Sequence, residues 1–236
     1  MGGVIGARIL YIITEWDFFF HKHPWVKFLN IEIPSIVAIW NGGLVYWGGF
    51  VGGLVACVVY AKIKKIPMLY FLDIIANVIP LIQAFGRIGC LFAGCCYGKL
   101  MNSQNSFGLR FPPGSVAFDT LIDSGLNGKI KTYMIEHNHT WPLFPCQLIE
   151  SISVFLIYLI LTVVSNNKKF HGQILLNYIL LYSVARILIE FFRGDIERGY
   201  LLNNTLSTSQ FISLITIVVS IFFTVILRNN RSAKIN

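Results

Sequence analysis

The sequence predicts an all-α, polytopic membrane protein. Hydrophobic residues make up 55 % of the 236 residues and charged residues only 13 %, about half of the roughly 25 % that soluble domains carry. The apolar residues form runs near the length of about 20 residues that a helix needs to cross a bilayer, and Lys and Arg lie between the runs. The mean hydropathy of +0.66 excludes a disordered chain, a disulfide-stapled secreted domain and an ordinary water-soluble enzyme.

We expect about five full spanning helices and one short N-terminal helix, in a single integral membrane domain covering residues 1–236. The full spans are expected at about Ile36–Ala61, Leu69–Tyr97, Gln147–Val164, Ile174–Phe192 and Phe211–Leu227. The segment Met1–Thr14 is apolar but short and carries Arg8, which fits a clipped or tilted span. A signal peptide would need basic residues before the apolar run and a small-residue cleavage site after it.

Basic residues in the short connections predict the orientation. If every run crosses, one side receives Lys62 to Lys65, Lys168 with Lys169, and the tail with Arg228, Arg231 and Lys234. The positive-inside rule makes that side the cytoplasm, so the C-terminus is expected to be cytoplasmic. The net charge of +8 therefore reflects topology, and no nucleic-acid partner is expected. The polar stretch 99–143, between the second and third long spans, is expected to form an extracytoplasmic head or lid.

Histidines and aromatic residues in the connections give weaker signals. No carboxylate or cysteine pattern at ligand spacing completes a metal site around His21, His23, His137 and His139. We interpret them as solvated loop histidines and expect no metal and no cofactor. An aromatic belt at the outer membrane interface is the ordinary interpretation of Trp40, Tyr46, Trp47 and Trp141.

Arg87 stands in the middle of the second long span. An Arg at a helix centre costs about 2.5–3.5 kcal/mol on insertion scales, so it persists there only with a partner or a function. Four glycines surround it, at positions 86, 89, 94 and 98. Glycines let a backbone or a ligand approach closely, and they permit a broken helix beside a cavity. The stretch therefore predicts an anion pocket.

A second charged set lies at the end of the fourth span. Arg186, Glu190 and Arg193 are spaced i, i+4 and i+7, which places them within an arc of about 60° on one helical face. An internal network that pins two helices would explain these three alone. With Arg87 added, three arginines face one nearby carboxylate, and the two unmatched charges would cost roughly 5–7 kcal/mol. Because guanidinium groups match phosphate geometrically, we predict a bound phospholipid headgroup.

The third span begins with further candidates. Glu150, beside Gln147, either belongs to the same pocket or is an interfacial carboxylate in water. The thiols of Cys90, Cys95 and Cys96 cannot share one face of a helix, because offsets of five and six residues turn about 140° and 240°. We therefore favour a packing role for these cysteines over a metal or redox centre.

At these residues the chain resembles the prolipoprotein diacylglyceryl transferase family. The matching segments are Gly6-Ala7-Arg8 with Tyr11, Trp40 to Gly43 followed by Gly48-Gly49, Gly86 to Gly98, Phe144 to Glu150, and Arg186 to Arg193 followed by Ser207 to Phe211. The family's enzymes transfer a diacylglyceryl group from phosphatidylglycerol to the thiol of a lipoprotein signal-peptide cysteine and release glycerol phosphate. The resemblance therefore implies lipoprotein maturation in the bacterial cytoplasmic (inner) membrane, with membrane lipids as further partners.

The resemblance also implies roles for single residues. Arg87 matches the family's phosphatidylglycerol-binding arginine, Gly98 closes its signature, and Arg186, Glu190 and Arg193 match its charged face. We expect catalytic roles for Arg87, Arg186 and Glu190. Lipid binding is expected of Arg87, Arg193, Gly98, Gln147 and Glu150.

Four residues depart from the family's pattern. Trp47 and Phe144 stand where the family has histidines, and Cys90 and Cys95 replace an asparagine and a glutamate of the signature. Three ways to activate the acceptor thiol therefore remain: Glu150 as the base, Glu190 as the base, or the positive field of the arginines without a base. The chain also begins near the family's second helix, so the expectation is a late start site or a divergent branch. The alternative is that the chain is a paralogue that uses another lipid or another acceptor. An anion or lipid transporter is a further alternative, which is disfavoured because only one span is interrupted by glycines.

Overall fold

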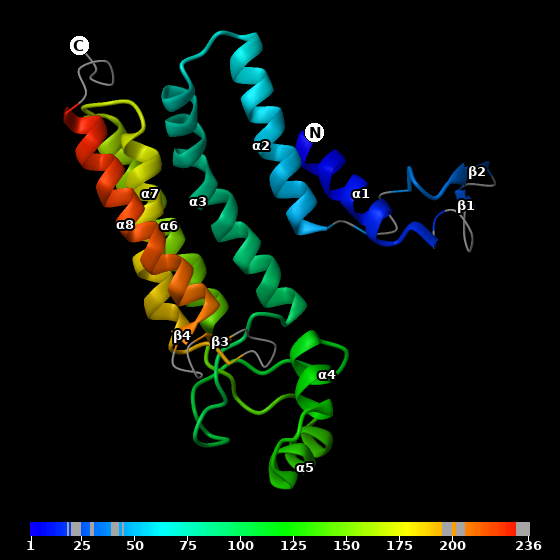
Figure 1. The fold of residues 1–236 in the computed structure, drawn as a ribbon. Coiled ribbons are helices and arrows are strands. Elements are labelled where there is room, and N and C mark those ends of the chain that lie inside the picture. The colour runs from blue at the N-terminus through cyan, green and yellow to red at the C-terminus, as the bar shows by residue number, and fades with distance from the viewer. Residues whose placement is uncertain are drawn as a thin grey trace. The chain divides into compact units, whose positions relative to one another are not determined.

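The computed structural model describes residues 1–17, 19, 25–28, 31–38, 43, 45–194, 200–201 and 206–229, with backbone only at 27, 28, 31, 32, 46, 47, 200, 201 and 206. Figure 1 shows the elements. They are α1 (Gly2–Thr14), β1 (Trp25–Phe28), β2 (Ile31–Pro34), α2 (Tyr46–Ile63), α3 (Met68–Ala93), α4 (Val116–Asp123), α5 (Gly128–His137), α6 (Cys146–Ser165), α7 (Gln173–Glu190), β3 (Tyr200–Leu201), β4 (Leu206–Ser207) and α8 (Thr208–Asn229). The chain divides into two compact units, Met1–Phe71 and Leu72–Asn236.

The predicted class is confirmed: the protein is a polytopic, all-α membrane protein. Among the described residues, four helices are long and apolar enough to span a bilayer, namely α3, α6, α7 and α8. The two strand pairs, β1–β2 and β3–β4, are short antiparallel hairpins. Two further apolar helices, Gly2–Thr14 and Gly48–Ile63, are shorter, so the full span expected at Ile36–Ala61 is shorter than predicted.

In the first unit, Arg8 binds the described residues that precede α2 through their backbone carbonyl groups. Arg8 is buried and donates hydrogen bonds to the carbonyl groups of Ser35, Ile36, Ala38 and Gly43 at 2.5–3.2 Å. The described residues 35–38 form a turn, in which the N–H of Ala38 donates to the carbonyl group of Ser35. The predicted start of this span at Ile36 is therefore wrong, and the helix begins at Tyr46.

Helices α1 and α2 approach closely through glycines. A Cβ added at Gly52 would lie 2.8 Å from Cα of Gly6, whereas one at Gly53 would meet nothing nearer than Cα of Gly3 at 3.9 Å. Small residues spaced four apart let two helix backbones touch, which drives helix association in lipid. Trp40, His21 and His23 lie outside the described residues, and only the backbones of Tyr46 and Trp47 are described.

The second unit contains a bundle in which α6, α7 and α8 lie side by side (Figure 1). Ala76 of α3 packs with Ile157, Leu161 and Ile174 in a fully apolar cluster. At one end of the bundle the buried carboxylate of Asp73 accepts hydrogen bonds from three backbone N–H groups at the start of α7, those of Gly172, Ile174 and Leu175, at 2.9–3.2 Å. Lys168 lies 3.5 Å from the same carboxylate. This carboxylate caps α7 where the helix dipole favours a negative charge.

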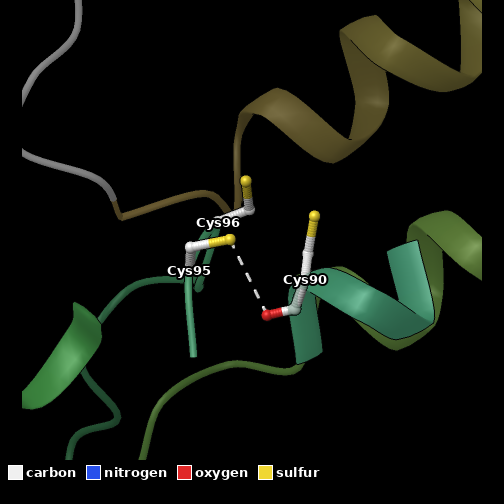
Figure 2. Close-up of side chains that lie close together, drawn as sticks. All are labelled: Cys90, Cys95 and Cys96. Atoms are coloured by element: carbon white, nitrogen blue, oxygen red, sulfur yellow. Dashed lines mark hydrogen bonds between the residues drawn. The ribbon is translucent and has the colours of Figure 1, made fainter. Parts of the chain in front are cut away.

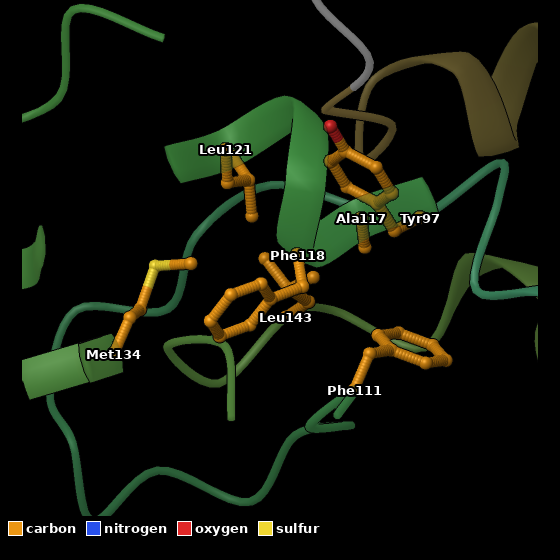
Figure 3. Packing of buried hydrophobic residues seen from close by; sticks show 7 residues of the cluster. All are labelled: Tyr97, Phe111, Ala117, Phe118, Leu121, Met134 and Leu143. Carbon is orange, nitrogen blue, oxygen red and sulfur yellow. The ribbon is translucent and has the colours of Figure 1, made fainter. Parts of the chain in front are cut away.

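The segment predicted as a head is folded around a core of its own (Figure 3). Phe118 of α4 and Met134 of α5 pack with Leu143, and Tyr97, Phe111, Ala117 and Leu121 complete the cluster. Side chains at the N-caps, Ser115 and Asn127, accept hydrogen bonds from the first turns of α4 and α5. Its histidines and tryptophan lie beside α5, where His137 stacks on Tyr133 and Trp141 donates to the carbonyl group of Met101.

Candidate active site

The structure brings four of the predicted charged residues together at one end of the bundle. Arg87 on α3 contacts Glu150 on α6, with Nη2 and Oε1 2.8 Å apart. Arg186 on α7 lies 3.5 Å from Glu150 and 3.1 Å from Glu190. Three spanning helices therefore meet in one chain of alternating charges, which we call the charged cluster (Arg87, Glu150, Arg186 and Glu190).

The charge count made from the sequence is corrected by this geometry. Glu150 is 2 % exposed and Glu190 is 6 % exposed, so Glu150 belongs to the cluster and is not an interfacial carboxylate in water. Two arginines meet two carboxylates, and the formal charge of the cluster is zero. The count made from the sequence set three arginines against Glu190 alone. Glu150 adds a second carboxylate, and Arg193, the third arginine of that count, is not one of the four residues of the cluster.

The cluster is nevertheless accessible through its arginines, and Arg87 is more exposed than Arg186, whose side chain is 14 % exposed. The side chain of Arg87 is 19 % exposed, whereas that of Glu150 beneath it is 3 % exposed. Gly86 and Gly89 lie on either side of Arg87 in the sequence. Outside their chain neighbours and the backbone of their own helix, an added Cβ at either would meet no described atom within 4 Å. The expected close approach of protein backbone is therefore not found at these two glycines.

An apolar cavity adjoins the cluster. It has a volume of about 320 Å³ and lies between α3 and α6. Its lining residues are Ala84, Phe85, Ile88, Ser151, Ile152, Phe155 and Leu156. Ile88 directly follows Arg87, and Ser151 directly follows Glu150, so the cavity and the charged cluster share the same two helical turns. A charged group and an apolar cavity side by side match the two parts of a phospholipid.

The remaining predicted residues surround the turn that follows α3. Gln147 is 1 % exposed and donates from Nε2 to the carbonyl group of Cys95 at 2.8 Å, while its Oε1 accepts no hydrogen bond from the described residues. Gly98 pairs with Arg193 in a short antiparallel bridge, and its N–H donates to the carbonyl group of Phe144. A Cβ at Gly98 would lie 2.7 Å from that of Phe144, so a larger residue would push the two segments apart.

The three signature cysteines are closer together than the helical spacing predicts. Helix α3 ends at Ala93, four residues before the predicted end at Tyr97, because Gly94 adopts a left-handed conformation with φ +68°. Cys96 is also left-handed, with φ +58°, and the chain folds back. Figure 2 shows Cys90, Cys95 and Cys96 gathered at this turn, with all three sulfur atoms within 4.8 Å of one another.

The environment of Cys95 argues against a nucleophilic role for this residue. Burial, together with the neighbouring thiols of Cys96 and Cys90, raises the pKa of the Cys95 thiol to about 12. At neutral pH the side chain is therefore a thiol and not the reactive thiolate.

Sequence reasoning missed two features of the site. Ser209 on α8 accepts a hydrogen bond from Nε of Arg186 at 2.9 Å, although it lies in the Ser207–Phe211 segment that matches the family. Phe144, at a family histidine position, stacks on Phe192 with ring centres 4.9 Å apart. This ring pair packs the loop before α6 against the residues that follow α7.

Comparison with known proteins identifies the family of this chain. A family profile described as prolipoprotein diacylglyceryl transferase matches residues 1–226. A phosphatidylglycerol–prolipoprotein diacylglyceryl transferase of Clostridium tetani is 34 % identical over 94 % of this chain and 75 % of its own length. Phosphatidylglycerol–prolipoprotein diacylglyceryl transferase 2 of Clostridium perfringens is 33 % identical over 92 % of this chain and 72 % of its own length. The transferase of Streptococcus uberis is 29 % identical over 97 % of this chain and 75 % of its own length. The chain therefore belongs to the prolipoprotein diacylglyceryl transferase family.

Proposed function

We propose that this protein transfers a diacylglyceryl group from phosphatidylglycerol to the thiol of the lipobox cysteine in a prolipoprotein signal peptide, releasing glycerol phosphate. The observation that carries the proposal is Arg87, which is partly exposed above a buried carboxylate and stands beside an apolar cavity. The two substrates are those for which the relatives from Clostridium tetani and Clostridium perfringens are named. The charged cluster supplies the local chemistry.

The lipid is held in two parts. Its phosphate binds the exposed side of Arg87, next to Gly86, where an added Cβ would meet no other part of the described chain within 4 Å. Arg193 and the backbone near Gly98 border the headgroup. An acyl chain occupies the apolar cavity between α3 and α6. Gln147, whose buried Oε1 accepts no hydrogen bond from the described residues, binds a hydroxyl group of the headgroup, because an unsatisfied buried acceptor is costly.

The reaction is a displacement at the glyceryl carbon. The acceptor sulfur forms a bond to this carbon, the bond from carbon to phosphate oxygen breaks, and its electron pair leaves with glycerol phosphate. Negative charge grows on the leaving phosphate, and guanidinium groups already fixed in place stabilise it. Arg87 and Arg186 are held by carboxylates at 2.8 and 3.1 Å, so little reorganisation is needed.

We assign acceptance of the thiol proton to Glu190. Glu150 bridges the two arginines, Oε1 toward Arg87 and Oε2 toward Arg186, and Oε2 of Glu190 lies 3.1 Å from Arg186. Glu190 is the last residue of α7, where the chain turns toward the Gly98 bridge. On this assignment Glu190→Gln loses transfer and Glu190→Asp retains part of it, because only the aspartate can take a proton.

The site lies at the extracytoplasmic side of the bacterial cytoplasmic membrane in this proposal. The cluster occupies the end of the bundle formed by the end of α3, the start of α6 and the end of α7. Lys168 and Arg228 belong to the opposite end, where the positive-inside rule favours cytoplasm. The C-terminus is then cytoplasmic, and the folded segment 99–143 covers the outer end, where a secreted prolipoprotein presents its cysteine.

The test uses purified protein, labelled phosphatidylglycerol and a lipobox peptide. We expect the parent protein to form a thioether product. Arg87→Lys should lower the rate of product formation by about 100-fold, because lysine lacks the planar fork of donors. The exposed control Arg110→Lys should leave this rate unchanged. A parallel arm with labelled phosphatidylethanolamine should give no product. Absence of product from phosphatidylglycerol, in conditions where a relative with both histidines is active, would overturn the proposal.

A further inference from the structure

The turn after α3 gathers three thiols that the proposed transfer reaction does not use. Cys90 is on the last turns of α3, and Cys95 and Cys96 follow the left-handed Gly94. The backbone N–H of Cys95 donates to the carbonyl group of Cys90 at 3.1 Å, and Sγ of Cys95 lies 3.8 Å from the same oxygen (Figure 2). The close spacing of the thiols is therefore built into the backbone.

The spacing of the sulfur atoms is close to that required around one metal ion. For a metal–sulfur bond of about 2.3 Å, ligand sulfurs stand about 3.8–4.0 Å apart. The three sulfurs already lie within 4.8 Å of one another. Side-chain rotations that move the sulfur atoms by less than one ångström would bring them to this spacing. All three side chains are half-buried, which leaves them reachable while shielding them from bulk solvent.

The type of ligand selects the type of ion. Three sulfur donors favour a soft, thiophilic cation, and thiolates prefer Cu(I) or Zn(II) to Mg(II) or Ca(II). Within the described residues no histidine or carboxylate joins the group. Zn(II) in a closed protein site takes four ligands, whereas this site offers three, so the geometry favours Cu(I).

We propose that Cys90, Cys95 and Cys96 form a binding site for one Cu(I) ion at the end of α3. Binding replaces three thiol protons, which pass to solvent, and forms three copper–sulfur bonds without oxidation or reduction. Conformational strain supports a role for this turn, because Cys96 is a non-glycine residue held at φ +58°. Such conformations cost energy and persist where the surrounding structure demands them. The proposal does not depend on the transferase activity.

The test measures binding to the full chain in detergent under anaerobic conditions. Cu(I) is supplied from a coloured chelator whose loss of colour reports transfer to the protein. We expect one Cu(I) per chain, with new sulfur-to-copper ultraviolet absorption. Each of Cys90→Ser, Cys95→Ser and Cys96→Ser should weaken binding by at least 100-fold. The control Cys57→Ser, on α2 in the other unit, should bind as the parent does.

A second measurement on the unmodified chain avoids dependence on the folding of variants. Cysteines are alkylated with and without Cu(I), and mass spectrometry locates the modified positions. Protection of Cys90, Cys95 and Cys96 together, with Cys57 still alkylated, supports the site. Equal alkylation of the three cysteines with and without Cu(I), failure to compete with the chelator, or equal loss of binding in Cys57→Ser would overturn it. Zn(II) bound more tightly than Cu(I) would also contradict the assigned ion.

Discussion

Replacing Glu150 by Gln removes the negative charge that joins both arginines of the cluster. In the parent protein Oε1 lies 2.8 Å from Arg87 and Oε2 lies 3.5 Å from Arg186. At an effective dielectric constant near 20, each attraction amounts to about 5 kcal/mol before desolvation is subtracted. Breaking a buried ion pair by removing one partner costs about 3–5 kcal/mol net. We expect a loss of this size in the free energy of unfolding of Glu150→Gln.

The proposed lipid site predicts that an anionic lipid recovers part of this loss. The substitution changes the formal charge of the cluster from zero to +1, so a phosphate gains a more favourable partner. A ligand present at about 100 times its Kd stabilises the folded state by about 2.7 kcal/mol. Phosphatidylglycerol should therefore stabilise Glu150→Gln more than it stabilises the parent, and phosphatidylcholine, which carries no net charge, should not.

The assay is the unfolding midpoint in detergent micelles supplemented with either lipid. Glu136→Gln is the matched control, because Glu136 is exposed on α5 and its loss should leave the midpoint unchanged in both lipids. An unchanged stability of Glu150→Gln in phosphatidylcholine would refute the pairing of this carboxylate with two arginines. Equal effects of the two lipids on the variant would refute the phosphate site at the cluster.

Three further predictions follow from the packing. Asp73→Asn should lower the free energy of unfolding by about 3 kcal/mol, because the buried carboxylate of Asp73 caps α7 and contacts a lysine. The control Asp123→Asn, at an exposed position, should change this free energy little. Chemical denaturation measures the stability of both variants. Gly52→Ala should destabilise the first unit, because the added Cβ would lie 2.8 Å from a backbone atom of α1, whereas Gly53→Ala should be tolerated. The rate of proteolysis within α1 distinguishes the two variants. Equal sensitivity of both variants to the protease would contradict close contact between the helices. Gly86→Ala should raise helix stability by up to about 1 kcal/mol but reduce transfer, since the methyl group enters the space proposed for the headgroup, and unchanged activity would argue against that placement.

The charged cluster could be predicted from the sequence because ionisable residues are rare in spanning helices. Arg87, Arg186 and Glu190 stand out within apolar runs, and their cost in lipid implies partners. The identity of the partners could not be predicted, since Glu150 sits near the start of its span, where water and a pocket are equally compatible with a carboxylate. Only the packing of α3 and α7 against α6 decides that Glu150 lies between two arginines.

Two features escaped prediction because backbone conformation determines them. The helical-wheel argument separated the cysteines by assuming a helix as far as Tyr97, although Gly94 is a residue type that commonly ends helices in the left-handed conformation. The hydrogen bonds of Arg8 escaped for a different reason. Its partners are backbone carbonyl groups, which every residue type carries, so no side-chain pattern marks them.

The neutral charge of the cluster has a consequence for how the proposed site binds lipid. If the arginines had no partner, phosphate binding would be driven by relief of their unpaired charge, and product release would be opposed by the same amount. With Glu150 beside Arg87 at 2.8 Å, the carboxylate balances the guanidinium while the site is empty, and an incoming phosphate shares Arg87 with it. The leaving glycerol phosphate gains negative charge and is repelled by Glu150. This repulsion favours release of the product. A catalyst that must turn over benefits from this arrangement, because tight binding of the product would slow every cycle.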